Sequence, residues 1–119
     1  MTNDSDKIFD WHATLKLNKD NVTFAKEILK MFLTHLAESQ VLINQYYIAG
    51  DKPEFCAQLH KLYGGCCYCI VPKLAASVKQ LEMALKTQDL SKVANLLAVV
   101  NQEITMLQDA ATANQLIPN

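Results

Sequence analysis

The chain has 119 residues, half of them hydrophobic, a size and composition that allow one compact core and predict a single domain over residues 1–119. Its formal net charge is −1 and every one of its basic residues is a lysine, so it lacks the positive face and guanidinium groups with which proteins usually hold nucleic acid. The first residues do not have the layout of a signal peptide, and no apolar run is long enough to cross a bilayer, so we expect a cytoplasmic protein without direct membrane contact.

The beginning of the chain predicts a tail followed by one short helix. Residues 1–5 are polar and are expected to form a frayed, disordered tail. Residues 7–17 are predicted to form a short helix that docks on the rest of the protein through Phe9, Trp11 and Leu15.

A long helix is predicted over residues 20–49, because apolar residues recur there at alternating spacings of three and four. Ser39 is the one interruption of that stripe. Gly50 is suited to end the helix, and Asp51 is suited to cap the next one. The expected inward residues are Val22, Ala25, Leu29, Phe32, Leu36, Ser39, Ile43 and Tyr46.

Three further helices are predicted over residues 53–69, 72–86 and 89–113. The first contains two consecutive glycines and is expected to continue through both, because its inward spacing continues to Cys69. The expected inward residues are Phe55, Leu59, Leu62, Cys66 and Cys69 in the first helix, Leu74, Val78, Leu81 and Leu85 in the second, and Leu90, Val93, Leu97, Val100, Ile104, Leu107 and Ala111 in the third.

These four amphipathic helices are joined by short connections, which force each helix to run antiparallel to the one before it. The sequence therefore predicts an all-α protein: an antiparallel up-down-up-down four-helix bundle with the short N-terminal helix as a cover. A fold of this kind does not by itself identify a function.

The stretch QLHKLYGGCCYC contains the residues best suited to chemistry. His60 lies on the flank of the inward stripe of its helix, about 100° around the axis from the preceding leucine. One turn away on that flank are the small residues Cys56, Gly64 and Cys67. We therefore expect that another molecule can approach the imidazole closely.

A carboxylate is predicted to face this histidine from the neighbouring helix. His60 lies eleven residues before Val71, near the corner between the two helices, and Glu82 lies eleven residues after it. In an antiparallel pair both stand at the same height, about 16 Å from the corner. Glu82 is expected to accept a hydrogen bond from Nδ1–H and to leave a lone pair on Nε2, while Lys61 and Lys79 place positive charge nearby.

Other interpretations of these residues remain open. Cys56 and His60 have helical i, i+4 spacing and Cys67 is close to them, which allows a metal site, although no CxxC pair occurs. Cys67 is also the candidate for a thiol redox role, whereas packing is the simpler interpretation of all four cysteines. His60 can equally be a solvated histidine in a surface ion pair, in a purely structural adaptor bundle.

The same residues resemble those of the histidine phosphotransfer (HPt) family. The segments LHKLYGG, VPKL and QLE are similar to its motif, His-x-Leu-Lys-Gly with a Gln or Glu twenty-two positions after the histidine, here His60, Leu62, Gly64 and Glu82. The opening DWHATLKLNKDNVTFAKEILKMFL resembles the C-terminal HPt domain of BarA/GacS-type hybrid sensor kinases, so the resemblance covers nearly the whole chain.

The resemblance implies a phosphorelay intermediate, either a free protein or the cytoplasmic end of a membrane-bound sensor kinase. His60 would accept a phosphoryl group on Nε2 from a receiver-domain aspartate and pass it to a response regulator, with Glu82 orienting the ring, Gly64 keeping the approach open and Lys61 supplying charge. The domain would be a monomer without cofactor, metal or kinase activity of its own, because the receiver brings the Mg²⁺.

Two positions depart from the family pattern. Tyr63 stands where the family usually has a lysine, and Ile70 where a glycine is common. His12 and His35 are expected to be ordinary surface or boundary residues. The large apolar side chains at helical spacing are expected to lie in the core or at its margins, and those exposed near the histidine would form the apolar part of a receiver-docking patch: Phe24, Met31, Phe32, Met83 and Met106.

Overall fold

The computed structural model describes residues 7–117, so the tail predicted for residues 1–5 lies outside the described residues. Throughout the described part of the chain the regular structure is helical, which confirms the predicted all-α class. The elements are α1 (Trp11–Leu17), α2 (Val22–Ala49), α3 (Lys52–Gly65), α4 (Pro72–Lys86), the short 3₁₀ helix η2 (Leu90–Lys92) and α5 (Val93–Thr112).

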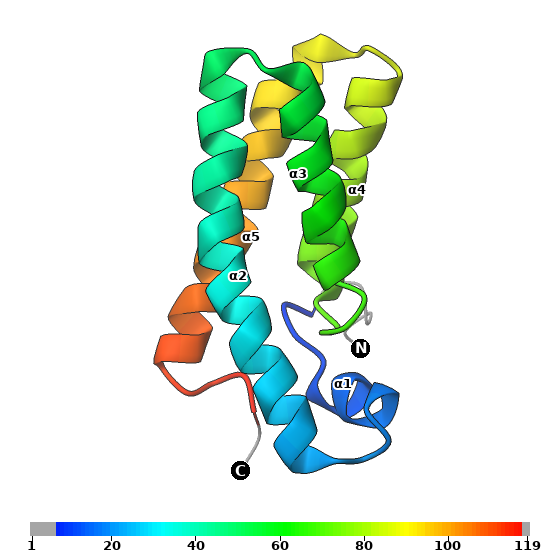
Figure 1. Cartoon of the computed structure of the whole chain (residues 1–119), viewed down its shortest axis with the longest axis vertical. Helices are drawn as coiled ribbons and strands as arrows, with labels where there is room; N and C mark the ends of the chain where they lie inside the picture. Colours follow the sequence, from blue (N-terminus) through cyan, green and yellow to red (C-terminus); the bar gives the residue numbers. More distant parts are fainter. Residues whose placement is uncertain (1–6, 118–119) are drawn as a thin grey trace.

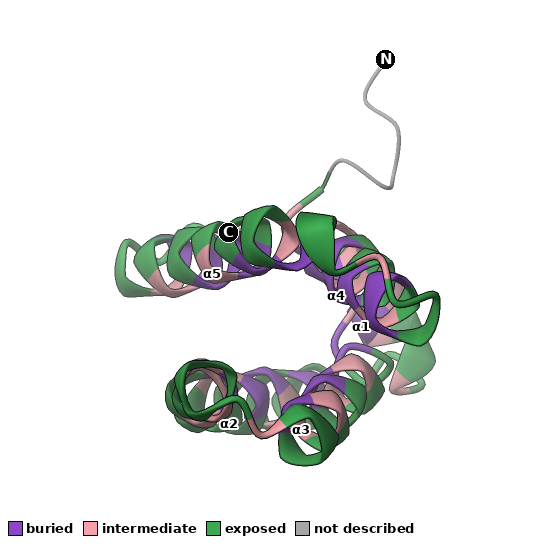
Figure 2. Ribbon diagram, turned by 90° about the horizontal axis from the view of Figure 1, so that it is seen from above, coloured by how far each residue is buried: buried purple, intermediate pink, exposed green. Residues whose placement is uncertain are grey.

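Helices α2 to α5 form the predicted antiparallel bundle (Figure 1). Each helix packs against the next one in the chain, and α5 returns to contact α2, so the four helices enclose a common interior. Figure 2 shows the buried residues on the sides of the helices that face this interior. The buried apolar side chains form one cluster to which α1 also contributes, and α1 packs against α2 below the α3–α4 connection.

Helix α2 has both of the predicted ends. The side chain of Asn21 accepts a hydrogen bond from the Phe24 amide at 3.0 Å, and Gly50 ends the helix in the left-handed conformation with φ 71°. The helix begins at Val22 rather than at residue 20, because Asp20 itself has a positive φ of 61°. Val22 is therefore at the exposed tip of the helix, and its predicted inward position is wrong.

Helix α1 begins at Trp11, not at residue 7. The Asp10 carboxylate accepts a hydrogen bond from the Ala13 amide at 3.0 Å and so caps the helix. The residues before Asp10 run along the α3–α4 connection, where the Asp10 amide donates to the Ile70 carbonyl at 2.8 Å. The fully buried Thr14 hydroxyl accepts from the Ile70 amide at 3.0 Å, and α1 is thereby attached to the corner that follows α3.

Helix α3 continues through both glycines but ends at Gly65, so the predicted end at Cys69 is wrong. Residues 66–70 form turns, which still carry the side chains of Cys66 and Cys69 into the core. Helix α4 has the predicted bounds. Helix α5 begins four residues later than predicted because η2 precedes it, and Leu90 in η2 is 61% exposed rather than inward.

Candidate functional site

His60 and Glu82 face each other across the contact between α3 and α4. The His60 Nδ1 lies 3.6 Å from the Glu82 Oε2, with the imidazole side chain 82% exposed and the carboxylate side chain 11% exposed. This distance is longer than a hydrogen bond, so the predicted hydrogen bond from Nδ1–H to Glu82 is not formed and the contact is electrostatic. The sequence register that placed the two residues at one height thus brings their side chains together.

The contact distinguishes the two nitrogens of the imidazole. A carboxylate beside Nδ1 favours the tautomer that carries its proton there, and it stabilises a positive charge on the ring. In that tautomer the lone pair belongs to Nε2, on an imidazole that is almost entirely exposed to solvent. Such a nitrogen is able to act as a nucleophile.

The second oxygen of Glu82 has an unusual environment. Its Oε1 is buried and has no hydrogen-bond partner among residues 7–117. A buried acceptor left without a partner destabilises the folded state by about 1–3 kcal/mol. The carboxylate is therefore a costly choice for packing alone, which points to a use in chemistry.

A second contact joins α3 and α4 beside the first. The Lys79 ammonium lies 5.1 Å from the centroid of the Tyr63 ring, within the range of a cation–π interaction. Tyr63 follows His60 by three residues, and Lys79 precedes Glu82 by three. In this antiparallel pair the Tyr63–Lys79 contact therefore lies next to the His60–Glu82 contact, about one helical turn along the helices.

The remaining predicted site residues lie on different sides of α3. Lys61 is exposed and lines a groove between α3 and α2, so its charge and that of Lys79 on α4 flank the helix from opposite directions. Gly64 is exposed, and a methyl group added there would meet no heavy atom within 4 Å outside the helix's own backbone. Among the described residues of the free domain, nothing therefore requires a glycine at this position.

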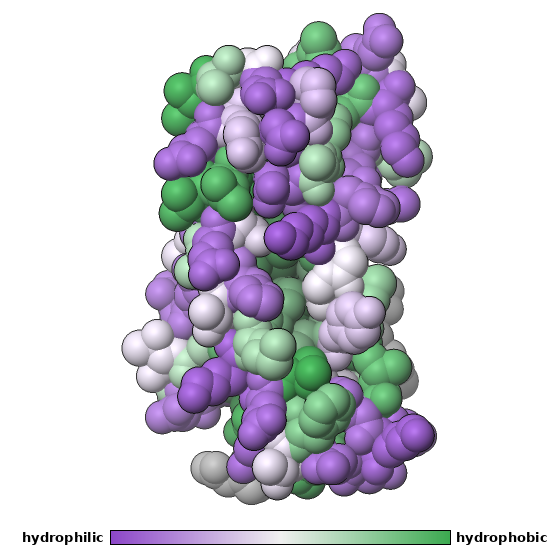
Figure 3. All heavy atoms as spheres, viewed as in Figure 1, coloured by the Kyte–Doolittle hydropathy of each residue, from purple (hydrophilic) through white to green (hydrophobic). Residues whose placement is uncertain are grey.

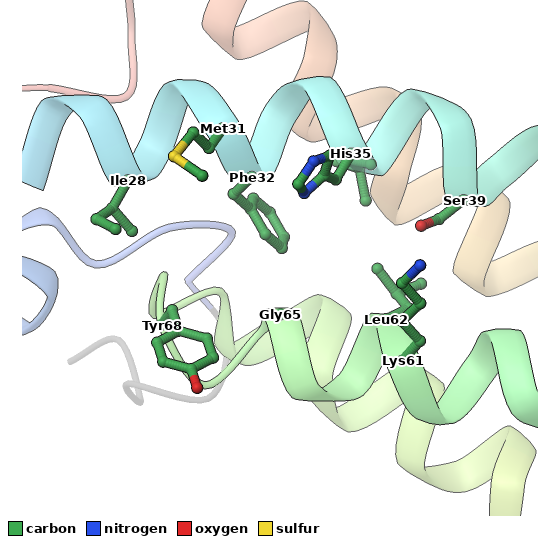
Figure 4. Close-up of a pocket in the computed structure, with 10 residues that line it drawn as sticks. Ile28, Met31, Phe32, His35, Ser39, Lys61, Leu62, Gly65 and Tyr68 are labelled. Carbon is green, nitrogen blue, oxygen red and sulfur yellow. The ribbon is translucent and has the colours of Figure 1, made fainter.

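The groove beside Lys61 is apolar, and we name it the α2–α3 groove (Figure 4). Its volume is about 310 Å³, and Figure 3 shows hydrophobic atoms in a hollow of the same face. Met31 and Tyr68, at its edge, are 56% and 68% exposed. The groove is lined by Ile28, Met31, Phe32, His35, Leu36, Ser39, Lys61, Leu62, Gly65 and Tyr68.

Only part of this groove was predicted from the sequence. Met31 is exposed in it, whereas Phe32 is buried at its floor, and Phe24, Met83 and Met106 are exposed but do not line it. Tyr68 was not anticipated, because it lies in the turns that replace the predicted end of α3. With the end of α3 predicted at Cys69, the direction of the Tyr68 side chain could not be predicted correctly.

The cysteines are all free, and their environments differ. Burial raises the pKa of the Cys66 thiol from 9.0 to about 12, helped by the neighbouring Cys67 and Cys69, and burial likewise raises the pKa of Cys69 to about 12. Cys67 is exposed, and its thiol donates to the Tyr63 carbonyl at 3.6 Å. Two of the four thiols are therefore kept protonated and unreactive at neutral pH.

Two features of residues 7–117 concern a metal site and a membrane span. Within this range no group of three His, Cys, Asp or Glu side chains is arranged to hold a metal ion. Over the same residues, no helix combines the length and the apolar character needed to cross a bilayer.

The sequence and the fold are both similar to those of a known family. The family model described as Hpt domain matches residues 27–110, a range that contains both His60 and Glu82. The chain belongs to the Hpt domain family. The crystal structure of the HPT domain from a hybrid histidine kinase of Shewanella has a TM-score of 0.70 with this Hpt domain at 26% sequence identity, over 93% of this chain and 97% of that one.

Two curated relatives are much longer proteins. The Hpt domain is 29% identical over 90 residues to the sensor histidine kinase GacS of Pseudomonas protegens, which is 76% of this chain and 10% of the kinase. It is 30% identical over 79 residues to the signal transduction histidine-protein kinase BarA of Shigella flexneri, which is 66% of this chain and 8% of that protein. The chain thus spans about a tenth of the length of these relatives.

Proposed function

We propose that this Hpt domain is a phosphorelay intermediate in which His60 takes a phosphoryl group from the aspartate of one receiver domain and delivers it to the aspartate of another. The observation that supports this most directly is an exposed imidazole whose Nδ1 faces a largely buried carboxylate. It leaves Nε2 both nucleophilic and accessible, as a phosphoryl acceptor must be.

The transfer requires no external acid or base. The Nε2 lone pair forms the P–N bond while the P–O bond of the aspartyl phosphate breaks, and the bonding electrons leave with the receiver's carboxylate. The imidazole retains its Nδ1 proton and becomes cationic, and Glu82 stabilises that charge from 3.6 Å. Reversal of the same step on a second receiver returns the neutral ring.

The other site residues have supporting roles in this proposal. Lys61 provides positive charge beside the histidine for the incoming phosphoryl group. Gly64, one turn from His60, keeps side-chain atoms away from the path of the receiver's active site. The Mg²⁺ ion belongs to the receiver, so the domain acts as a phosphocarrier without nucleotide-dependent kinase activity of its own.

The α2–α3 groove is the surface on which the receiver docks. Lys61 lines the groove and directly follows His60, so a protein seated in the groove reaches the imidazole without rearrangement of the bundle. Exposed Met31 and Tyr68 supply the apolar anchors of such an interface. We place this monomeric domain in the cytoplasm, where receiver domains are found, away from nucleic acid and membrane.

The test is transfer from a receiver domain that has been phosphorylated with acetyl phosphate in the presence of Mg²⁺. The Hpt domain should acquire one phosphoryl group that survives base and is lost in acid, as a phosphohistidine does. His60→Gln should remove this label and leave the helical circular dichroism unchanged, with His12→Gln, an exposed histidine of α1 outside the groove, as the matched control. Transfer to His60→Gln at the wild-type rate would refute the assignment, and an unlabelled wild type with a panel of receivers would favour a structural adaptor.

A further inference from the structure

The Tyr63–Lys79 contact joins α3 and α4 beside the His60–Glu82 contact, about one helical turn from His60. We propose that Lys79 stabilises the phosphoryl group on His60 and that the Tyr63 ring is the positioning residue that holds its ammonium there. This inference rests on the proposed function. It adds Tyr63 to the site and gives a defined position to Lys79, whose charge the sequence already predicts to be nearby.

The need for a cation follows from the charge of Glu82. Its carboxylate favours the cationic phosphohistidine ring, but it also repels the phosphoryl group, which carries close to two negative charges. A positive charge near the carboxylate offsets that repulsion. Lys79 is on the same helix as Glu82, three residues before it, and so projects on the same side of α4.

An exposed lysine does not hold its charge in one place unless something restrains its long side chain. Lys79 is exposed, whereas Tyr63 is half-buried and therefore offers a fixed ring face. The ammonium lies 5.1 Å from the centroid of that ring. The contact keeps the charge at the α3–α4 interface, within about one turn of the imidazole, instead of leaving it to move in solvent.

Lys61 does not make Lys79 redundant. It follows His60 directly and lines the α2–α3 groove, on the side of α3 opposite to Glu82. In the proposed complex that side is covered by the receiver. Lys79 is on the α4 side, where Glu82 places its negative charge.

Potassium phosphoramidate tests this inference, because it phosphorylates an imidazole without any docking surface. The P–N bond to Nε2 forms as the P–N bond of the reagent breaks and ammonia leaves with a proton from solvent. The rate constant for base-stable labelling of His60 should fall about two- to fivefold in Lys79→Gln and in Tyr63→Leu. Tyr63→Phe, which keeps the ring face, should retain the wild-type rate.

Two further variants separate positioning from structure. Lys52→Gln makes the same charge change in the first turn of α3 and should label at the wild-type rate. The double variant Tyr63→Leu/Lys79→Gln should be no slower than Lys79→Gln, because the ring acts only through the ammonium. Thermal unfolding of each variant shows whether the domains compared are equally folded.

The outcomes distinguish this inference from the proposed function. Equal labelling of the wild type, Lys79→Gln and Lys52→Gln would overturn the role of Lys79 and leave the role of His60 intact. Slowing in Lys79→Gln but not in Tyr63→Leu would overturn the positioning role of Tyr63. Labelling that persists in His60→Gln would remove both the inference and the proposed function.

Discussion

The Glu82 carboxylate meets the His60 imidazole with one oxygen and buries the other. Oε2 lies 3.6 Å from Nδ1, while Oε1 has no hydrogen-bond partner among the described residues. Glu82 therefore holds a charge at the edge of the core with its buried oxygen outside any hydrogen bond to the described residues. In the proposed function this carboxylate assists phosphoryl transfer, whereas its unpaired oxygen lowers stability, and mutation separates the two effects.

Replacement of Glu82 should affect rate and stability in opposite directions. Glu82→Leu removes the orphaned oxygen and should raise the free energy of unfolding by about 1 kcal/mol, because a buried unpaired acceptor is lost. It should also slow transfer from a phosphorylated receiver by about three- to tenfold without abolishing it, because Nε2 remains exposed. Urea denaturation and single-turnover labelling measure the two effects, with Glu54→Leu, on the exposed first turn of α3, as control. Equal transfer rates in Glu82→Leu and the wild type would remove its orienting role.

Substitution of Gly64 tests whether the receiver needs open space beside His60, and it leaves the imidazole itself unchanged. Because a methyl group meets no atom within 4 Å there, Gly64→Ala should stabilise the free domain by about 0.5–1 kcal/mol, the usual gain in a helix. If the receiver's active site passes over this position, transfer from the receiver should slow several-fold, whereas labelling by phosphoramidate should not change. Stopped-flow transfer and thermal unfolding provide the comparison. A receiver reaction as fast as that of the wild type would show that the open space is not used.

The docking role of the α2–α3 groove predicts a loss of affinity without a loss of intrinsic reactivity. Tyr68→Ala removes the more exposed of the two anchors and should weaken receiver binding about tenfold, a typical effect of losing an interface aromatic residue. Phosphoramidate labelling of His60 should stay at the wild-type rate. Ile48→Ala is the control, because Ile48 is 84% exposed near the opposite end of α2. Equal affinities of Tyr68→Ala and Ile48→Ala, measured by calorimetry, would move the docking surface elsewhere.

The buried thiols predict a selective reactivity and a pH dependence. At pH 8 a thiol reagent should modify Cys67 readily and leave Cys66 and Cys69 unmodified until the domain unfolds, because burial raises the pKa of both thiols to about 12.

Between pH 9 and 12 the unfolded chain loses these thiol protons and the folded domain keeps them, so the free energy of unfolding should fall as pH rises. The fall should be shallower in Cys66→Ala/Cys69→Ala, which retains every lysine and tyrosine. Identical pH profiles would contradict the burial of the two thiols in solution.

The sequence was a good guide wherever periodic burial decides the structure. The spacing of three and four located α2, α4 and most of α5, and the register about the corner at Val71 brought His60 and Glu82 together. Both results depend on helix geometry, which follows from residue count alone.

The predictions failed at helix ends and in turns, where a particular hydrogen bond determines the position at which a helix begins or stops. Helix α1 starts at Trp11 because Asp10 caps it and binds the Ile70 carbonyl, a contact between residues sixty positions apart. Cys69 is inward without being helical, since a turn can bury a side chain as well as a helix can. Tyr68 and the Tyr63–Lys79 contact were missed for the same reason: side-chain directions across elements are not set by spacing within one.

The sharpest test of the proposed transfer is to determine which nitrogen of His60 carries the phosphoryl group. After transfer from a phosphorylated receiver, NMR of the ¹⁵N-labelled domain should show the phosphoryl group on Nε2 of His60 and the proton retained on Nδ1, the nitrogen 3.6 Å from Glu82. A phosphoryl group on Nδ1, on another residue, or nowhere in the domain would contradict the account.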